Sequence, residues 1–328
     1  MKRTRIIING CMSVLLLLMA AVLLTGCSSD NDTIANATDG SPLELKAAVV
    51  SGLATRSTTA SDNAWTVGDI VTVKDGTTSI SYQYAISDAS TGAMTGTGTT
   101  IYFSPSETSK PITAWSYGGG TYSSTLPTSW SASTTQNTAA TLQANDFLYA
   151  SATAKPLVTT TLAFNHKMAK IVIQLKSTNT NITSSNTTLS NVLVKAVNVG
   201  TFDGSSWTTS GTEIASFTPL AGTSSGYLST YTTLVIPQTM SGKELFRFTI
   251  TSGTFTRTFA YTPATAVLAA GGNYIYTIDF NFDKVTLTAM TAPTWSQSAD
   301  GTITEVCTIL KQVSGTWTPS SDGAITVN

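Results

Sequence analysis

The sequence predicts an all-β protein with two β-sandwich domains in tandem and a short C-terminal strand appendage. Strand-favouring residues are abundant, above all Thr with Val, Ile, Tyr and Phe, and apolar side chains alternate with polar ones along many segments. Gly, Ser, Asp and Pro separate these segments, and no segment shows helical periodicity over three turns. The chain has 328 residues, of which 41% are hydrophobic and 11% charged, so it is long enough and apolar enough for two cores.

The first 26 residues have the pattern of a lipoprotein signal peptide. Three basic residues precede an apolar run at 14–24, which is too short to cross a bilayer. The run ends in Leu24-Thr25-Gly26-Cys27, which resembles a bacterial lipobox, where the cysteine thiol accepts a diacylglycerol. We expect removal of residues 1–26, lipidation of Cys27 and a flexible tether at 27–42. An ordinary secretory signal followed by an incidental cysteine is the alternative.

The composition excludes several classes of function. The 17 basic and 18 acidic residues nearly cancel and form no basic patch, so we expect no nucleic-acid partner. His166 is the only histidine, the carboxylates are scattered, and neither a phosphate-binding glycine motif nor a nucleophile elbow occurs. We therefore expect no enzymatic activity, no cofactor and no metal site. Once the signal is removed and Cys27 is lipidated, only Cys307 remains, so the fold must be stable without disulfides.

The first predicted strand is Leu43–Val50. Its apolar residues, Leu43, Leu45, Ala47 and Val49, alternate with Glu44 and Lys46, which is the pattern of a half-buried strand. Arg56 follows in a loop of small residues. Further strands are predicted at 70–73, 79–86, 100–103, 111–117 and 158–164, and together they make an N-terminal β-sandwich at 43–160.

The second predicted sandwich covers residues 161–295. Its strands are expected at 168–175, 191–199, 230–236, 245–251, 255–262, 273–280 and 284–290, whereas 118–145 and 177–190 are expected to be loops. Residues 296–328 form the C-terminal appendage, in which the apolar stretches 303–313 and 324–327 are candidate strands.

The inward face of the chain changes near residue 168. Phe164, His166 and Met168 share one strand face, whereas Ala169 and Ile171 have the opposite parity, which predicts a bulge or a crossing between domains. We expect His166 to be a buried, hydrogen-bonded residue and not a catalyst. The six tryptophans fit core packing better than a sugar-stacking platform, which is the other interpretation.

Several segments follow one another in a characteristic order. They are the lipobox at Cys27, the segments 54–57 (ATRS) and 65–69 (WTVGD), the strand 164–171, Val235–Gln238 (VIPQ), and 271–278 (GGNYIYTI). Their order and spacing resemble the fimbrillin-like subunits of type V pili in Gram-negative anaerobes. The resemblance runs from about residue 43 to Trp295, and it implies two transthyretin-like β-sandwich domains without catalytic activity.

The resemblance also implies an assembly mechanism. A lipoprotein precursor reaches the outer membrane, and an arginine-specific protease cuts after Arg56, so that the product begins at Ser57 and loses the strand 43–50 with its lipid. The groove left behind accepts a strand from the next subunit, and subunits polymerise head to tail into a cell-surface fimbria. The expected partners are other pilus subunits, the protease, the outer membrane, and ligands on host or bacterial surfaces.

The residues after Trp295 bear on the type of subunit. A stalk subunit needs a donor strand, and the candidate donor residues are Ile303, Val306, Ile309, Leu310 and Val313. This tail favours a stalk subunit, while a pilus tip or anchor subunit stays open. The alternative from another class is a surface glycan-binding lipoprotein of a nutrient-uptake system, which would need exposed aromatic residues on a concave face.

Overall fold

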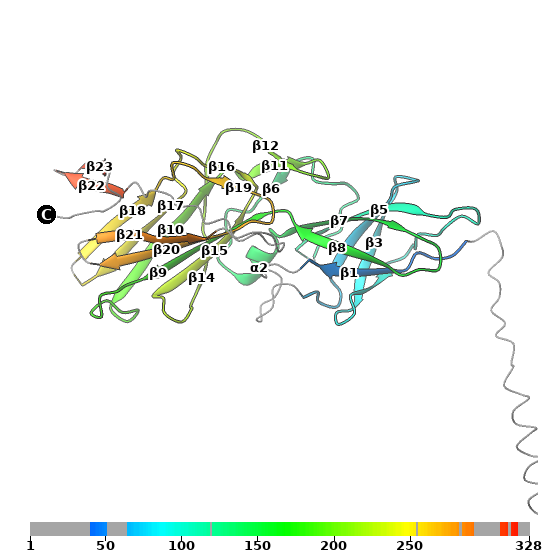
Figure 1. Ribbon diagram of the computed structural model, residues 1–328, viewed down its shortest axis with the longest axis horizontal. Coiled ribbons are helices and arrows are strands. Elements are labelled where there is room, and N and C mark those ends of the chain that lie inside the picture. Colours follow the sequence, from blue (N-terminus) through cyan, green and yellow to red (C-terminus); the bar gives the residue numbers. More distant parts are fainter. Residues whose placement is uncertain are drawn as a thin grey trace, which may run out of the picture.

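The protein is an elongated molecule made almost entirely of strands (Figure 1). The computed structural model describes residues 40–50, 64–118, 120–253, 255–281, 284–291, 309–313 and 316–320. Within these ranges the one helix, α2 (Ala139–Gln143), has five residues. The expected all-β class is therefore confirmed.

The strands of the N-terminal part form one closed sheet, at the right in Figure 1. Its order is β1 (Leu45–Val49), β4 (Ala93–Gly96), β3 (Ser81–Asp88), β2 (Ile70–Asp75), β5 (Lys110–Tyr117), β7 (Phe147–Ala154) and β8 (Thr160–His166). The sheet closes because β1 pairs on both sides, antiparallel with β4 and parallel with β8. The sequence predicted β1 but not this double pairing.

The C-terminal part packs two larger sheets face to face. One contains β14 (Leu220–Gly222), β15 (Ser229–Val235), β9 (Ala169–Lys176), β20 (Asn273–Asn281) and β21 (Lys284–Thr291). The other contains β13 (Ala215–Phe217), β10 (Thr187–Ala196), β17 (Phe246–Ser252) and β18 (Phe255–Tyr261). Phe246 of β17 and Tyr276 of β20 meet edge to face with ring centroids 5.3 Å apart, so the two sheets share one core.

Three small sheets complete the fold. They are β12 (Trp207–Thr209), β11 (Val199–Phe202) and β6 (Trp130–Ser131); β16 (Gln238–Thr239) with β19 (Val267–Leu268); and β22 (Ile309–Val313) with β23 (Thr316–Ser320). The expected loops were wrong in part, because 118–145 contains β6 and α2 and 177–190 contains the start of β10. The expected strand at 100–103 was also wrong, since Tyr102 forms only an isolated bridge with Pro42.

Two hydrophobic cores meet where β8 leads into β9. Phe164 is buried in the core of the closed sheet, whereas Met168 and Ala169 are buried in the larger core. Between them His166 is buried, and its Nδ1 lies 2.8 Å from Oδ1 of Asp146. The expected change of inward face and the buried, hydrogen-bonded state of His166 are confirmed. The domain boundary at 160/161 remains a prediction, because Phe147 of β7 also contributes to the larger core.

Candidate functional site

The candidate site is the place that β1 occupies, which we call the β1 seat: the space between β8 on one side and β4 with residues 101–103 on the other. The parallel ladder joins Leu45–Val49 to Thr160–Phe164, and the antiparallel pairing joins Leu45 to Met94. Backbone hydrogen bonds extend this pairing, from Leu43 N to Ile101 O at 2.8 Å and from Val50 N to Phe164 O at 2.9 Å. β1 is thus an internal strand, and its loss would leave an unpaired edge on each side.

The side chains of β1 alternate between core and solvent. Leu43, Leu45 and Ala47 are buried in the core of the closed sheet, and Val49 is half-buried against it, while Lys46 and Ala48 are exposed. Burial of the two leucines and the alanine contributes about 5 kcal/mol at most. The predicted inward residues of the first strand therefore occupy the positions that the period-2 pattern assigned to them.

The seat is also shaped by its backbone. Ala47 N donates to the carbonyl of Gly92 at 2.8 Å, and a Cβ on Gly92 would lie 2.0 Å from Ala47 O. Gly40, which lies in the segment that leads into β1, makes a similar approach to the seat, since a Cβ there would lie 1.4 Å from Phe103 O. Both glycines have positive φ, which a residue with a side chain adopts only with strain. The seat consequently fits a strand backbone closely at two points.

Aromatic side chains support the seat from inside the core. The Trp65 ring packs edge to face on Phe164, with centroids 5.1 Å apart, and Phe164 is the residue of β8 that pairs with Val49. The Tyr84 hydroxyl accepts a hydrogen bond of 3.2 Å from Ile101 N, while Ile101 O accepts the bond from Leu43. Burial raises the pKa of Tyr84, so this hydroxyl stays protonated. The two segments that flank β1, β8 and residues 101–103, are thus held by contacts that do not depend on β1.

A cluster of charges lies at the end of the closed sheet where β1 begins. Lys110 Nζ lies 2.9 Å from Asp75 Oδ2 and 3.0 Å from Glu107 Oε1, and both Lys110 and Asp75 are buried. Burial alone would raise the pKa of Asp75, but the hydrogen bonds from Lys110 and from the backbone of Thr77 and Thr78 outweigh burial and lower it. This ionised cluster ties the start of β5 to the end of β2.

The predicted site residues divide into those that the structure describes and those that it does not. Leu43, Leu45, Ala47 and Val49 fill the β1 seat, and the candidate donor residues Ile309, Leu310 and Val313 lie in β22. The other predicted residues are outside the described ranges: Cys27, Arg56, Ser57, Ile303 and Val306. The contributions of Gly40 and Gly92 were missed, because no local sequence pattern signals a close approach between distant backbones.

The described residues contain no group of three or more His, Cys, Asp or Glu side chains that could hold a metal ion. A search of the same residues for a helix long and apolar enough to cross a membrane also finds none. Among the described residues, the feature that stands out is a strand, β1, that closes a sheet by pairing on both sides.

Comparison with known proteins identifies the family. Residues 55–295 match the family model described as fimbrillin-like, which covers most of the chain. The protein therefore belongs to the fimbrillin-like family. This membership supports a pilus-type subunit at the cell surface that assembles with other pilus subunits. No curated protein matches the sequence.

Solved structures share the fold at low sequence identity. A Bacteroides uniformis protein described as a cell adhesion protein is 20% identical, with a TM-score of 0.57, over 78% of this chain and 99% of its own. A Bacteroides ovatus protein with the same description is 18% identical, with a TM-score of 0.54, over 80% of this chain and 98% of its own.

Proposed function

We propose that this protein is the lipidated precursor of a stalk-type fimbrial subunit whose β1 seat is vacated by proteolysis after Arg56 and refilled by a strand from a neighbouring subunit. The observation that carries the proposal is the position of β1, an internal strand that precedes the region of family similarity. The match begins at residue 55, after β1 and one residue before Arg56.

Cleavage at Arg56 would separate β1 from the rest of the closed sheet without breaking another described strand. The six remaining strands would still be paired from β4 through β3, β2, β5 and β7 to β8. The exposed groove would present apolar core residues and two rows of unpaired backbone groups. An added strand with alternating apolar residues would cover the apolar core residues with its side chains and form hydrogen bonds with the unpaired backbone groups on both sides.

The shape of the molecule favours head-to-tail assembly. The end of the closed sheet where β1 begins and the hairpin β22–β23 lie at opposite ends of the long axis (Figure 1). A segment that extends from the C-terminal end of one subunit would thus approach the β1 seat of the next. Such heterologous contacts repeat without closing and make filaments.

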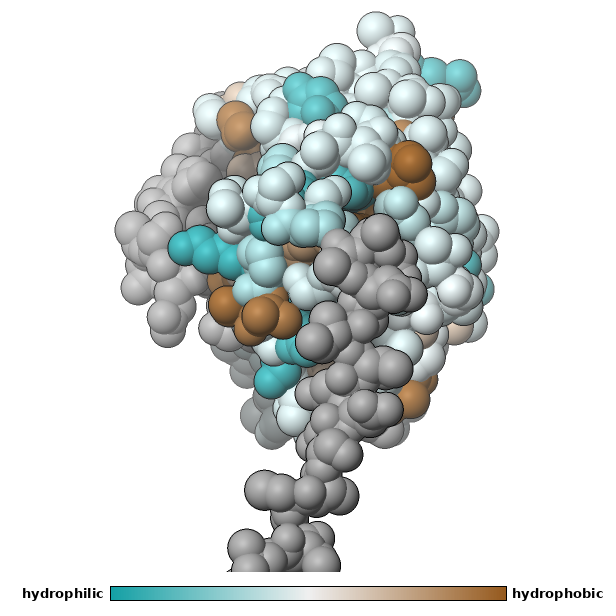
Figure 2. Space-filling model, turned by 90° about the vertical axis from the view of Figure 1, so that its right-hand side faces the viewer, coloured by the Kyte–Doolittle hydropathy of each residue, from teal (hydrophilic) through white to brown (hydrophobic). Residues whose placement is uncertain are grey.

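The end of the closed sheet where β1 begins also exposes apolar side chains. The strand registers bring the β2–β3 turn, the β7–β8 turn and the start of β1 to this end. Four exposed residues lie there: Ile80, Tyr102, Leu157 and Val158. Figure 2 views the molecule from this end and shows separate hydrophobic patches on a surface of mostly intermediate hydropathy. We expect these patches to contact the body of the neighbouring subunit around the inserted strand.

The test is limited digestion of the purified precursor with an arginine-specific protease. We expect a new N-terminus at Ser57 and a ladder of polymers that survives electrophoresis without boiling and collapses after boiling. Arg56→Ala is the matched control and should leave a full-length monomer. A wild-type protein that resists cleavage at Arg56 and stays monomeric would contradict the proposal and favour an anchor subunit.

A further inference from the structure

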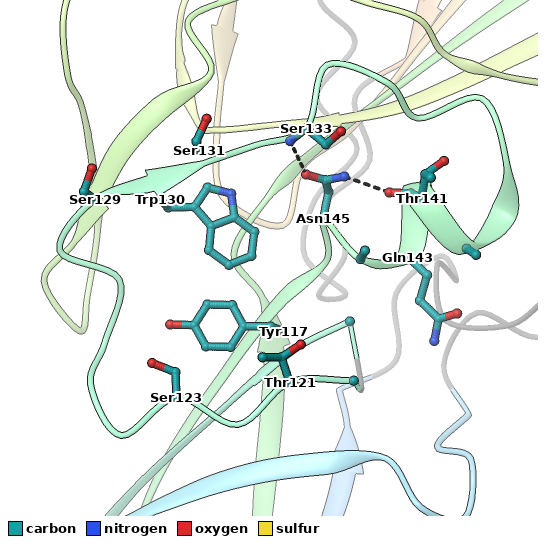
Figure 3. A pocket seen from close by; sticks show the side chains of 14 residues that line it. Tyr117, Thr121, Ser123, Ser129, Trp130, Ser131, Ser133, Thr141, Gln143 and Asn145 are labelled. Carbon is teal, nitrogen blue, oxygen red and sulfur yellow. Dashed lines mark hydrogen bonds between the residues drawn. The ribbon is translucent and has the colours of Figure 1, made fainter.

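A cavity of about 610 Å³ lies away from the β1 seat, between the end of β5, β6 and α2. Its walls come from three segments that are separate in sequence. Tyr117 ends β5, Trp130 lies in β6, and Gln143 and Asn145 lie at and just after the end of α2 (Figure 3). The volume is in the range of small-molecule sites in proteins.

One wall of the cavity is aromatic. The rings of Tyr117 and Trp130 are nearly parallel, with an interplanar angle of 11° and centroids 4.9 Å apart. Phe147 and Trp207 support Trp130 from behind, at centroid distances of 5.9 and 6.2 Å. Neither of these two supporting residues lines the cavity. The rings of Tyr117 and Trp130 are therefore held in place by the packing beneath them.

The facing wall is polar and rigid. Asn145 accepts a hydrogen bond from Ser133 N and donates one to Thr141 O, both at 2.7 Å (Figure 3). A Cβ on Gly118 would lie 2.2 Å from Gln143 O, so the loop after β5 and the end of α2 touch through their backbones. These contacts fix the width of the cavity before any ligand enters.

Several polar side chains around the cavity are free to bind a ligand. Within the part of the chain that the structure describes, the side chains of Thr121, Ser129 and Gln143 make no hydrogen bond. Trp130 Nε1 is buried and also lacks a partner among these residues. This nitrogen is covered by neighbouring atoms, so the side chains of Thr121, Ser129 and Gln143 are the polar groups available to a ligand.

The cavity is electrically neutral. None of the residues that line it is Asp, Glu, Lys, Arg or His. Burial raises the pKa of Tyr117 to about 12, so its hydroxyl stays protonated at physiological pH. Nothing in the lining would neutralise a phosphate, a sulfate or a carboxylate, so the chemistry favours an uncharged ligand.

We propose that this cavity binds one sugar ring of a neutral glycan. A pyranose has an apolar face of C–H groups that packs on aromatic rings, and hydroxyl groups around its edge that bond to neutral polar side chains. The wall of Tyr117 and Trp130 and the rim of Thr121, Ser129 and Gln143 supply both contacts. The site is separate from the β1 seat, so glycan binding goes beyond the proposed role in assembly.

The experiment applies the full-length protein to an array of neutral oligosaccharides that end in mannose, galactose, glucose or N-acetylglucosamine, with sialylated and sulfated counterparts. We expect binding to at least one neutral glycan and weaker binding to its charged counterpart. Titration of that glycan by tryptophan fluorescence should give the same affinity from pH 5 to pH 9, because no lining group titrates in this range.

Two variants and one control locate the binding. Gly120 lines the cavity and a Cβ on it meets open space, so Gly120→Leu adds a bulky apolar side chain to the lining without a clash at its Cβ. Gly120→Leu and Trp130→Ala should each weaken binding about tenfold or more. Tyr102→Ala is the control, because Tyr102 is an exposed aromatic residue at the opposite end of the closed sheet and does not line the cavity, and this variant should bind within about threefold of wild type. The proposal is overturned if no neutral glycan binds, if charged glycans bind better, or if Gly120→Leu binds like wild type.

Discussion

A Cβ on Gly92 would lie 2.0 Å from the carbonyl oxygen of Ala47, and Gly92 O accepts the hydrogen bond from Ala47 N. The β1 seat is therefore shaped for a strand backbone at this point as well as for apolar side chains. Any strand that replaces β1 with the same register meets the same close approach.

Gly92→Ala should destabilise the precursor by about 2–4 kcal/mol, because it adds a clash with β1 to the strain of a positive φ. Chemical denaturation measures the loss, and polymer formation after digestion should fall with it. Gly98→Ala is the matched control, since Gly98 also has positive φ but open space around its Cβ. Equal losses in the two variants would show that backbone strain accounts for the whole effect and that the approach to Ala47 is unimportant.

Leu45→Ala should cost the precursor about 2–5 kcal/mol, because it leaves a cavity in the core of the closed sheet. Lys46→Ala, one residue along the same strand and exposed, should change the free energy of unfolding by less than about 0.5 kcal/mol. If β1 is lost on processing, both variants should have wild-type stability after digestion and polymerisation. A Leu45→Ala defect that persists in the polymer would argue that β1 remains in its seat.

Removal of residues 296–328 should produce a subunit that folds and accepts a strand but cannot donate one. We expect the truncated protein, mixed with the wild type after digestion, to shorten the ladder of polymers in proportion to its fraction. Thermal unfolding of the undigested truncated protein serves as the control for folding. Ladders of normal length would remove the stalk assignment and the C-terminal donor.

The sequence predicts an element well where one face of a strand meets one core. The alternation at 43–50 placed Leu45 and Ala47 correctly, because the solvent face of β1 is polar or small. β7 was missed because its apolar side chains do not alternate with polar ones. Phe147 packs in the larger core, while its neighbour Leu148 and Ala150 pack in the smaller core. β6 was missed because its partner, β11, lies far along the chain and its two residues carry no strand periodicity.

The cavity could not be predicted from sequence for a related reason. Tyr117, Trp130 and Asn145 come from segments whose proximity depends on the pairing of β6 with β11 and on the close approach at Gly118. The tryptophans, considered as a group, favoured core packing, which is correct for Trp65 and Trp115. Trp130 is instead half-buried at the wall of a cavity.

Asp75→Asn should lower stability at neutral pH by about 3 kcal/mol, because it leaves Lys110 buried with Glu107 as its remaining partner. The pKa of Asp75 is lowered in the folded protein, so the folded state binds fewer protons than the unfolded state in acid. The stabilisation by ionised Asp75 is therefore fully present above the pKa that this carboxyl has in the unfolded chain, near 4. It is lost as the pH falls through the lower pKa that Asp75 has in the folded protein.

Urea unfolding between pH 2 and pH 7 tests this expectation. The wild type should lose stability below pH 4 more steeply than Asp75→Asn, and the two should converge in acid. The variant keeps some acid dependence, since the pKa of Asp88 is also lowered, to about 2, by hydrogen bonds from Ser90 and Thr91. Glu213→Gln, at an exposed carboxylate, is the control. If the free energy of unfolding fell in parallel with pH for wild type and Asp75→Asn, the ion pair of Asp75 with Lys110 would make no pH-dependent contribution to stability.

The side chain of Gln136 forms hydrogen bonds with residues of strand β15. Its Oε1 accepts hydrogen bonds from Leu234 N and from the Thr233 hydroxyl, and its Nε2 donates to Leu234 O, all within 2.9 Å. Gln136 and Leu234 are fully buried, so no water can replace these bonds.

Gln136→Leu keeps most of the side-chain volume but leaves the Leu234 N–H and C=O without their partner. We expect a loss of about 3–5 kcal/mol in the free energy of unfolding, because two or three buried polar groups become unsatisfied. The same substitution at Gln83, which is half-buried on β3 and whose side chain has no hydrogen bond among the described residues, should change stability by less than about 0.5 kcal/mol. Amide hydrogen exchange gives a second measurement, since Leu234 N–H should lose its protection in Gln136→Leu while its neighbours in β15 keep theirs. Retained protection at Leu234 would mean that another acceptor replaces Gln136, and the stability loss should then be small.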